Sequence, residues 1–304
     1  MSKTLVTGGA GFIGSHIVDR LIADGHEVVV LDNLSTGKRE NLNPKAKFVE
    51  CDIADYQAIL PHFSGADVVF HTAALARLTP SVKNPLPAHE ANATGTLNAL
   101  WASHNSGVKK FVYSSTSSIY GDRDPQDYPL KQTLDERFKS PYSLQKWIGE
   151  KYCKLFSEIY GLPTVIFRYF NVYGPRQITE GTYATVVGIF LRQRELGQPM
   201  TIVSDAGERR RDYTHVSDIV EGNILGWQKD VPSGEIFNLG RGKNYSVNEV
   251  AALIGGPTVK IDPRPWDAAI TLADRTKVRD ILGWEPKVSF EDGIAELKKI
   301  HGLS

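Results

Sequence analysis

Short apolar runs alternate with longer segments of helical spacing through the first half of the chain. Short apolar runs bounded by turn residues are typical of buried strands, and apolar positions three and four residues apart predict amphipathic helices. The predicted strands are Thr4–Val6, Glu27–Leu31, Lys47–Val49, Val68–His71, Lys110–Ser114 and Thr164–Tyr169, and the predicted helices are Ile13–Asp24, Tyr56–Phe63, His89–Ser106 and Ser143–Tyr160. Strands that alternate with helices form a parallel sheet covered on both faces. The pattern therefore predicts an α/β fold with a doubly wound parallel (Rossmann) sheet.

The second half of the chain is less regular and predicts a smaller C-terminal lobe. The predicted elements are a helix over Tyr183–Glu195, a strand at Met200–Val203, a strand at Ile236–Leu239 that returns to the main sheet, and a last helix over Phe290–Ile300. We expect residues 1–170, with a return segment at about 212–240, to form the Rossmann domain. Residues 171–211 and 241–304 are expected to form the lobe.

The composition excludes several classes of protein. The 304 residues include 35 Lys+Arg and 35 Asp+Glu, and this balance gives no support for binding to nucleic acid or to a membrane surface. We find no apolar stretch long enough to span a membrane and no signal-peptide pattern. Cys51 and Cys153 are far apart and form no disulfide or metal motif. We expect a cytoplasmic protein without a bound metal.

A glycine-rich turn between the first strand and the first helix predicts a dinucleotide site. Gly9, Gly11 and Gly14 fit the GxGxxG pattern, in which missing side chains let a pyrophosphate approach the helix N-terminus. Asp32 ends the second strand 18 residues after Gly14, where a carboxylate accepts hydrogen bonds from both ribose hydroxyls. A carboxylate there also repels a 2′-phosphate. The sequence therefore favours NAD over NADP.

A tyrosine and a lysine four residues apart are candidates for proton transfer. Tyr142 and Lys146 would share one face of a helix, and a nearby ammonium favours the phenolate form of a tyrosine. The preceding strand ends in a hydroxyl-rich run, 114–118, that contains Thr116. Ligands in open α/β sheets bind at the carboxyl ends of strands. This arrangement suits removal of a proton from an alcohol while NAD⁺ accepts the hydride.

At this point the chain resembles the extended short-chain dehydrogenases/reductases, and among them the NAD-dependent sugar-nucleotide epimerase/dehydratase family. The segments that carry the resemblance occur in the family's order: TGGAGFIGSH (7–16), LDNLSTG (31–37), HTAA (71–74), NATGT (92–96), SSTSSIYG (114–121), YSLQK (142–146), RYFNVYGPRQ (168–177) and RDYTHVSD (211–218). The resemblance implies that NAD is bound by Gly8, Gly11, Phe12, Ile13, Gly14, Asp32, Asn33, Ser35, Thr36, Gly37, Asp52, Ile53, Thr72, Ala73, Ala74, Asn92, Tyr142, Lys146 and Phe170.

The strand-end motif distinguishes members of this family. Its 4,6-dehydratases and decarboxylases carry carboxylates near the catalytic threonine, whereas this chain reads Thr116-Ser117-Ser118. The resemblance is therefore to the UDP-hexose 4-epimerases. It implies that Tyr142 takes the proton of the sugar 4-hydroxyl, that Thr116 orients the same oxygen, and that Lys146 lowers the tyrosine pKa. The substrate is expected to be UDP-glucose/UDP-galactose, with the N-acetylated pair as a second choice.

The resemblance also implies a substrate site and a quaternary structure. Substrate-binding residues are expected to be Thr116, Tyr142, Asn171, Thr201, Val203, Arg211, Arg264 and Asp267. The helical stretches at 89–106 and 142–160 are expected to form a homodimer interface. Two alternatives stay open at this point: an NAD(P)-dependent ketosugar reductase or other member of the same family, and a non-catalytic protein that retained the fold.

Overall fold

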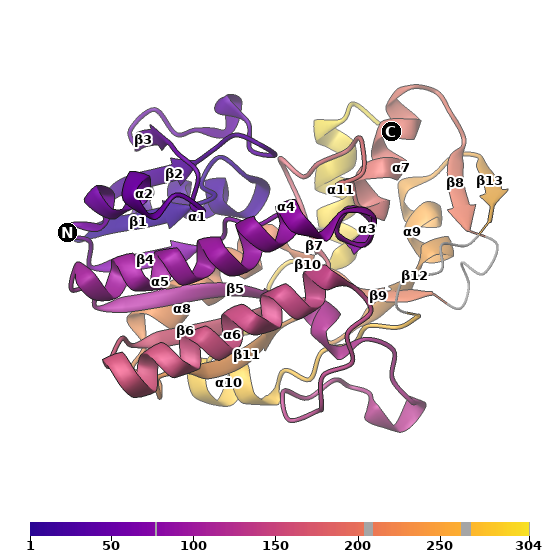
Figure 1. Cartoon of the computed structure of the whole chain (residues 1–304). Helices are drawn as coiled ribbons and strands as arrows, with labels where there is room; N and C mark the ends of the chain where they lie inside the picture. Colours follow the sequence, from indigo (N-terminus) through magenta and orange to yellow (C-terminus); the bar gives the residue numbers. More distant parts are fainter. Residues whose placement is uncertain (77, 204–208, 263–268, 304) are drawn as a thin grey trace.

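The computed structural model describes residues 1–76, 78–203, 209–262 and 269–303. A seven-stranded parallel sheet of order β11-β6-β5-β4-β1-β2-β3 forms its centre (Figure 1). The strands are β1 (Lys3–Thr7), β2 (Glu27–Asp32), β3 (Lys47–Glu50), β4 (Val68–His71), β5 (Lys110–Thr116), β6 (Thr164–Tyr169) and β11 (Glu235–Leu239). The strand order reverses between β1 and β4, and ligands in doubly wound folds bind at such a switch point. The predicted fold class is confirmed.

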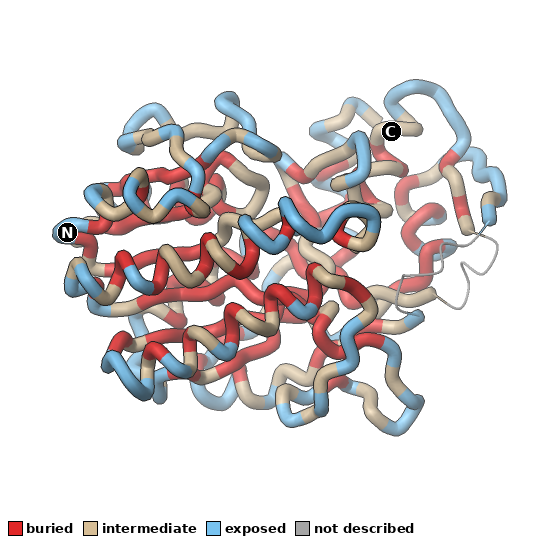
Figure 2. The backbone as a smooth tube through the Cα atoms, viewed as in Figure 1, coloured by how far each residue is buried: buried red, intermediate tan, exposed pale blue. Residues whose placement is uncertain are grey.

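Helices cover both faces of the sheet because its strands are apolar on both sides. Along β2, Val28 and Val30 pack in one hydrophobic cluster, whereas Val29 and Leu31 pack in the other. Alternate side chains of a strand point to opposite faces, so a continuous apolar run needs two covering layers. One layer contains α1 (Phe12–Ala23), α8 (Val216–Gln228) and α10 (Thr276–Leu282), and the other contains α2 (Tyr56–Phe63), α5 (Gly95–Asn105) and α6 (Pro141–Tyr160). Figure 2 shows the buried strands between these layers.

The smaller lobe has a hydrophobic cluster of its own, which includes Phe190, Tyr213 and Phe290. Its helices are α7 (Val186–Glu195), α9 (Val247–Ile254) and α11 (Phe290–Ile300). Short strand pairs connect it: β8 (Met200–Val203) with β13 (Thr258–Ile261), β9 (Arg210–Asp212) with β12 (Asn244–Ser246), and β7 (Val172–Tyr173) with β10 (Thr214–His215). No helix among the described residues is both long and apolar enough to cross a membrane.

Two predicted helices differ from the structure. The stretch predicted as one helix over His89–Ser106 is divided into α4 (Pro85–His89), a π-helical turn (Glu90–Thr94) and α5, and α3 (Leu78–Lys83) precedes it. The helix predicted from Tyr183 begins at Val186, because Thr185 has the extended backbone of an N-cap residue. By contrast, Ser140 and Ser143 form a capping box that begins α6 at Pro141, close to the prediction.

Asp212, at the end of β9, binds two loops of the smaller lobe through its buried carboxylate. Its two carboxylate oxygens accept hydrogen bonds from the backbone N–H groups of Arg241 (2.7 Å), Gly242 (2.9 Å) and Ala273 (2.9 Å). Burial raises the pKa of Asp212 to about 6, although these three N–H groups oppose the shift. The geometry needs acceptors on both sides of the carboxyl group, and an amide would turn an NH₂ group toward an N–H donor.

We therefore expect Asp212→Asn to lower the free energy of unfolding by about 2–4 kcal/mol, measured by urea denaturation. Asp274→Asn is the matched control, because Asp274 accepts from Thr276 N with one oxygen, which an asparagine also supplies. The control should lose no more than about 0.5 kcal/mol. Equal losses in the two variants would contradict the role given to Asp212.

Candidate active site

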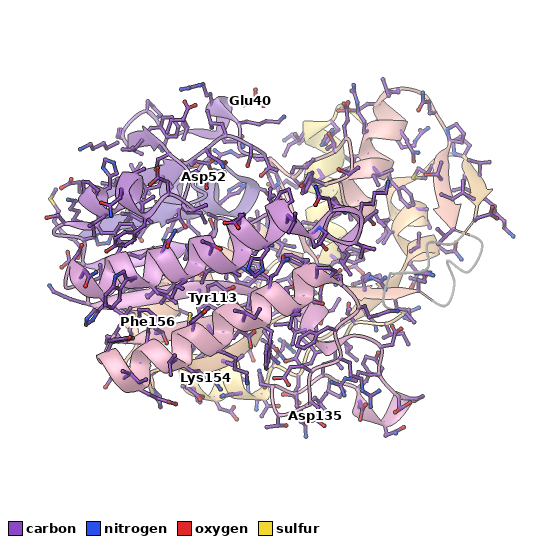
Figure 3. All side chains as sticks on the ribbon, viewed as in Figure 1. Glu40, Asp52, Tyr113, Asp135, Lys154 and Phe156 are labelled. Carbon is purple, nitrogen blue, oxygen red and sulfur yellow. The ribbon has the colours of Figure 1, made fainter. Side chains whose placement is uncertain are left out.

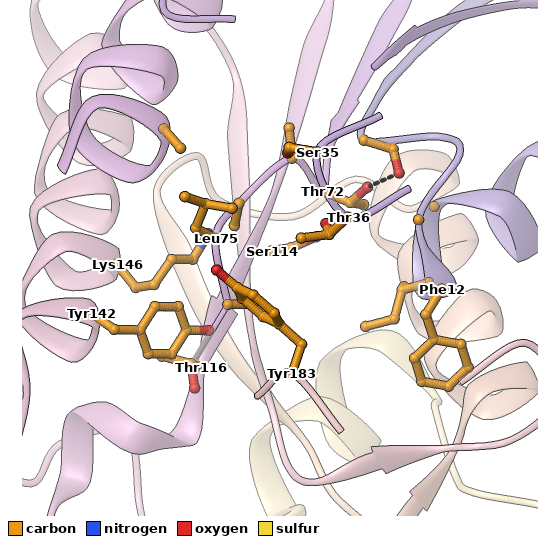
Figure 4. Close-up of a pocket in the computed structure, with 18 of the residues that line it drawn as sticks. Phe12, Ser35, Thr36, Thr72, Leu75, Ser114, Thr116, Tyr142, Lys146 and Tyr183 are labelled. Carbon is orange, nitrogen blue, oxygen red and sulfur yellow. Dashed lines mark hydrogen bonds between the residues drawn. The ribbon is translucent and has the colours of Figure 1, made fainter. Parts of the chain in front are cut away.

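A cavity of about 600 Å³ lies at the carboxyl ends of the central strands. This volume is within the range of small-molecule and cofactor sites. The predicted site residues that line it are Gly8, Gly11, Phe12, Ile13, Gly14, Asp32, Asn33, Ser35, Thr36, Asp52, Ile53, Thr72, Ala73, Ala74, Thr116, Tyr142, Lys146 and Asn171. In Figure 4, Tyr142, Lys146 and Thr116 lie on one side of the cavity, and Phe12 lies on the other.

The glycine-rich turn brings backbone to the cavity wall with no side chain between. Gly8 has φ +72°, and a Cβ there would lie 2.6 Å from Ala73 N, in the loop after β4. A Cβ at Gly14 would overlap the carbonyl oxygen of Gly8. Helix α1 begins directly after Gly11, which has no side chain to cap it. The first N–H groups of α1 and this bare turn fit the pyrophosphate of a dinucleotide.

Asp32 is held at the end of β2 by backbone donors. Its carboxylate accepts from Ala10 N (3.0 Å) and Leu34 N (2.8 Å), and Leu34 has φ +56°. Burial raises the pKa of Asp32, while the two N–H groups lower it. Asn33 donates to Asp52 (2.9 Å), which joins the ends of β2 and β3. The remaining acceptor capacity of Asp32 faces the cavity, as binding to a ribose requires.

Tyr142 and Lys146 lie on the first two turns of α6, facing the end of β5. Lys146 is only 2% exposed, and Tyr142 is 8% exposed. On the same side of the cavity, the Thr116 hydroxyl accepts from Ser118 N (3.1 Å), which fixes its orientation. Burial lowers the pKa of Lys146 to about 7, against the raising influence of Cys153 and Glu150. The site therefore combines a phenol, a hydroxyl and a desolvated amine, the groups that proton transfer at an alcohol needs.

Three predicted cofactor residues lie behind the lining of the cavity. The Asn92 amide accepts from Leu75 N (2.9 Å) and donates to Leu75 O (3.2 Å), so it supports the loop after β4. Phe170 is fully buried and packs near Tyr120, with ring centroids 6.1 Å apart. Gly37 lies against the Asp32 carboxylate. From these positions they can support the residues that line the cavity.

The predicted substrate residues are spread more widely. Asn171 lines the cavity with φ +25°, and its amide donates to Asp212 O (3.0 Å) and Thr271 Oγ1 (2.8 Å). Thr201 and Val203 lie in β8 and Arg211 lies in β9, all outside the lining. Arg211 donates to the backbone oxygen of Ala269 (2.9 Å). Arg264 and Asp267 lie outside the described residues.

Several lining residues were not predicted, and one group of them follows β7. Gln177, Tyr183 and Thr185 form part of the wall, and Figure 4 shows the Tyr183 side chain between Tyr142 and Phe12. Gln177 is 8% exposed, and neither of its amide atoms has a partner within the described residues. A buried amide of this kind can bond to water or to a ligand that both donates and accepts. Gln177 ends the RYFNVYGPRQ segment, so a sequence signal for it existed.

A metal site has no support among the described residues, since no three His, Cys, Asp or Glu side chains are grouped to hold an ion. His71 is fully buried between Thr7 (2.8 Å) and Thr96 (3.0 Å). His215 lies beside Ser217 (2.7 Å) and Glu296 (3.1 Å). The contacts of both histidines are with side chains of the fold.

Comparisons with known proteins show the family to which the chain belongs. The sequence pattern of the NAD dependent epimerase/dehydratase family matches residues 4–240. UDP-glucose 4-epimerase of Mycolicibacterium smegmatis is 38% identical over 308 residues, 97% of this chain and 96% of that protein. The structure of UDP-glucose 4-epimerase with UDP-glucose from Thermotoga maritima is similar with a TM-score of 0.93 and 41% identity, covering 98% of this chain and 97% of that chain. The Thermus thermophilus UDP-glucose 4-epimerase complex with NAD has a TM-score of 0.90 and 38% identity, covering 98% of both chains.

The burial of Lys146 gives a test that needs no substrate. The unfolded chain keeps a lysine protonated to its ordinary pKa of 10.5, whereas the folded protein releases the proton near pH 7. The unfolded state therefore binds more protons between these values, so the stability of the wild-type protein rises with pH across this window. We expect Lys146→Met to stabilise the ligand-free protein by roughly 2–5 kcal/mol at pH 7, and this gain to shrink as the pH approaches 10.

Urea denaturation of both proteins at several pH values measures the effect. Lys151→Met on the same helix is the control, because the Lys151 side chain is 51% exposed and should show no such trend. A Lys146→Met protein that is less stable than the wild type at every pH would contradict the desolvation argument.

Proposed function

The chain belongs to the NAD-dependent epimerase/dehydratase family, and we propose that it catalyses reversible epimerisation at C4 of a UDP-hexose. The observation that carries this proposal is the single cavity shared by the glycine-rich turn, Asp32, Tyr142, Lys146 and Thr116. A dinucleotide and a sugar hydroxyl can therefore reach one another at the end of β5. UDP-glucose/UDP-galactose is the proposed substrate pair, with the corresponding N-acetylated sugars as the second choice.

NAD is the cofactor, and the residues present fit it. The Gly8–Gly14 turn and the start of α1 would hold the pyrophosphate, and Asp32 would hold a ribose. When bound, NAD supplies reversible oxidation at the sugar C4 carbon. Gln177, whose amide has no partner among the described residues, and Asn171 also line the cavity, where they could contact a further part of a ligand.

The chain's own residues supply the proton chemistry. Tyr142 as phenolate takes the proton of the 4-hydroxyl, and Thr116 donates or accepts at the same oxygen to orient it. Lys146 in its charged form stabilises the phenolate and holds the cofactor ribose. The 4-keto sugar then turns over in the site, and the proton returns from Tyr142 when the opposite configuration forms. We place the remaining substrate contacts on Asn171, Thr201, Val203, Arg211, Arg264 and Asp267.

The strand end favours epimerisation over elimination. Thr116, Ser117 and Ser118 line the cavity there, and all three are hydroxyl residues without a carboxylate for dehydration. Asp32 argues against NADPH and hence against a net ketosugar reductase. The intact Tyr142 and Lys146 pair argues against a non-catalytic protein. We also propose the division into a Rossmann domain (1–170 with about 212–240) and a UDP-sugar lobe (171–211 and 241–304), and a cytoplasmic location.

Replacing the phenol tests the function directly. We expect the wild-type protein to interconvert UDP-glucose and UDP-galactose without added cofactor, followed by NMR, and Tyr142→Phe to lower kcat by at least about 100-fold while NAD stays bound. Tyr152→Phe, the same change on the same helix, should keep full activity. Turnover that consumes reduced cofactor would support the reductase instead, and absence of turnover with any UDP-hexose would contradict the proposal.

A row of exposed apolar residues on α6 supports the proposed homodimer. Leu144, Leu155 and Ile159 are 40%, 41% and 63% exposed and lie on one side of the helix, and Trp101 of the adjacent α5 is 38% exposed. Figure 1 shows α5 and α6 side by side on the outer face of the sheet. An apolar stripe of this kind is typical of a protein interface.

We expect the wild-type protein to sediment as a dimer and the Leu155→Glu/Ile159→Glu double variant to sediment as a monomer. Ile281→Glu is the control, because Ile281 is an equally exposed residue on α10, in the other helical layer. A double variant that stays dimeric would place the interface elsewhere.

A further inference from the structure

The buried ammonium of Lys146 lies over an aromatic ring. Its Nζ is 4.3 Å from the centroid of the Tyr113 ring, and Tyr113 is fully buried in β5. Figure 3 labels Tyr113 between α5 and α6. Among the described residues, no carboxylate forms an ion pair with Lys146. The face of the ring is therefore the direct contact of this charge on the side away from the cavity.

The other groups that face Lys146 are neutral or already paired. In α6, the Glu150 carboxylate accepts from Arg168 Nε (2.9 Å) and Nη2 (2.7 Å) and from the Ser115 hydroxyl (2.5 Å). Burial raises the pKa of the Cys153 thiol well above its usual value, so the thiol is neutral. In β4, burial, with Lys146 nearby, lowers the pKa of His71 well below its usual value. Arg168 thus balances the charge of Glu150, and none of these groups cancels the positive charge that Lys146 carries when it is protonated.

Contacts on three sides fix the Tyr113 ring beneath the ammonium. The phenol donates to the backbone oxygen of Lys146 (3.2 Å), and the His71 ring stacks on Tyr113 with centroids 5.8 Å apart. Gly149 of α6 leaves the room that the phenol occupies, since a Cβ there would overlap the Tyr113 hydroxyl. Burial raises the pKa of Tyr113 well above its usual value, so the phenol stays neutral and competes for no proton.

We propose that Tyr113 is a positioning residue that holds the Lys146 side chain in place and in its charged form through the face of its ring. A carboxylate in this position would also retain the proton, but it would cancel the charge that Tyr142 needs. The quadrupole of an aromatic ring attracts a cation without adding a net charge. This inference rests on the proposed function only for the role of Lys146 toward Tyr142.

A series of fluorinated rings tests the proposal at nearly constant volume. Tyr113 is replaced by phenylalanine and by mono-, di- and trifluorinated phenylalanine, because each fluorine weakens the negative face of the ring. A weaker face stabilises the charged lysine less, so Lys146 should lose its proton at a lower pH. The alkaline limb of kcat/KM should move to lower pH by up to about one unit along the series.

A second measurement does not depend on turnover. For each ring, the difference in unfolding free energy between the protein with Lys146 and its Lys146→Met form is followed against pH, and the midpoint of this difference should fall in step with fluorination. Phe111, a buried ring two positions earlier in β5, is the control: the same fluorinated residues there should leave this midpoint unchanged. If wild-type protein shows no UDP-hexose turnover, the proposed function fails while this measurement still decides the role of Tyr113. The role proposed for Tyr113 would be overturned if the midpoint does not change with fluorination, or if Tyr113→Phe alone produces the whole shift.

Discussion

The burial of one ammonium group beside a phenol is the constraint on which the site depends. Lys146 is almost wholly enclosed by protein, and removing a charge from water is costly unless a partner compensates. The face of the Tyr113 ring compensates in part for the burial of the Lys146 charge. The nearby Glu150 does not neutralise this charge, because it is bound to Arg168. A positive charge with little screening acts strongly on a neighbouring phenol. Helix α6 and strands β5 and β6 thus surround an amine whose positive charge, when it is protonated, is not cancelled by the nearby Glu150.

Local motifs explain why the nucleotide half of the site could be predicted. The turn over Gly8–Gly14, the position of Asp32 and the Tyr142–Lys146 spacing are each contained in a few consecutive residues, and short apolar strands alternate with amphipathic helices around them. The chemistry needs these residues at these spacings, so the signal survives in one sequence. The central strands were also predicted from local patterns, the short apolar runs, and their ends in the structure differ from the prediction by no more than two residues.

The second wall of the cavity could not be predicted in this way. Tyr183 and Thr185 reach it through an irregular segment between β7 and α7, whose course is set by tertiary contacts and not by periodicity. The π-helical turn at Glu90–Thr94 is a similar case, because it places Asn92 against the backbone of Leu75 at the cost of regular helix. Helix α9 was not predicted, because eight residues give only a weak periodicity; in the structure it begins with a capping box formed by Ser246 and Glu249.

The two halves of the site are coupled through buried polar groups. Asn171 lines the cavity, and its amide is bonded to the backbone of Asp212 and to Thr271. The Asp212 carboxylate in turn binds two loops of the smaller lobe. Asn171 also has a positive φ, a strained conformation that persists only where surrounding contacts fix it. These hydrogen bonds therefore join the end of β6 to the smaller lobe at the cavity wall itself. A second connection joins α1 to the segment after β7, where His16 bonds to Pro175 O (2.9 Å) and Arg176 pairs with Asp19 (2.7 Å). Changes to the lobe core can therefore reach the reacting groups by more than one route.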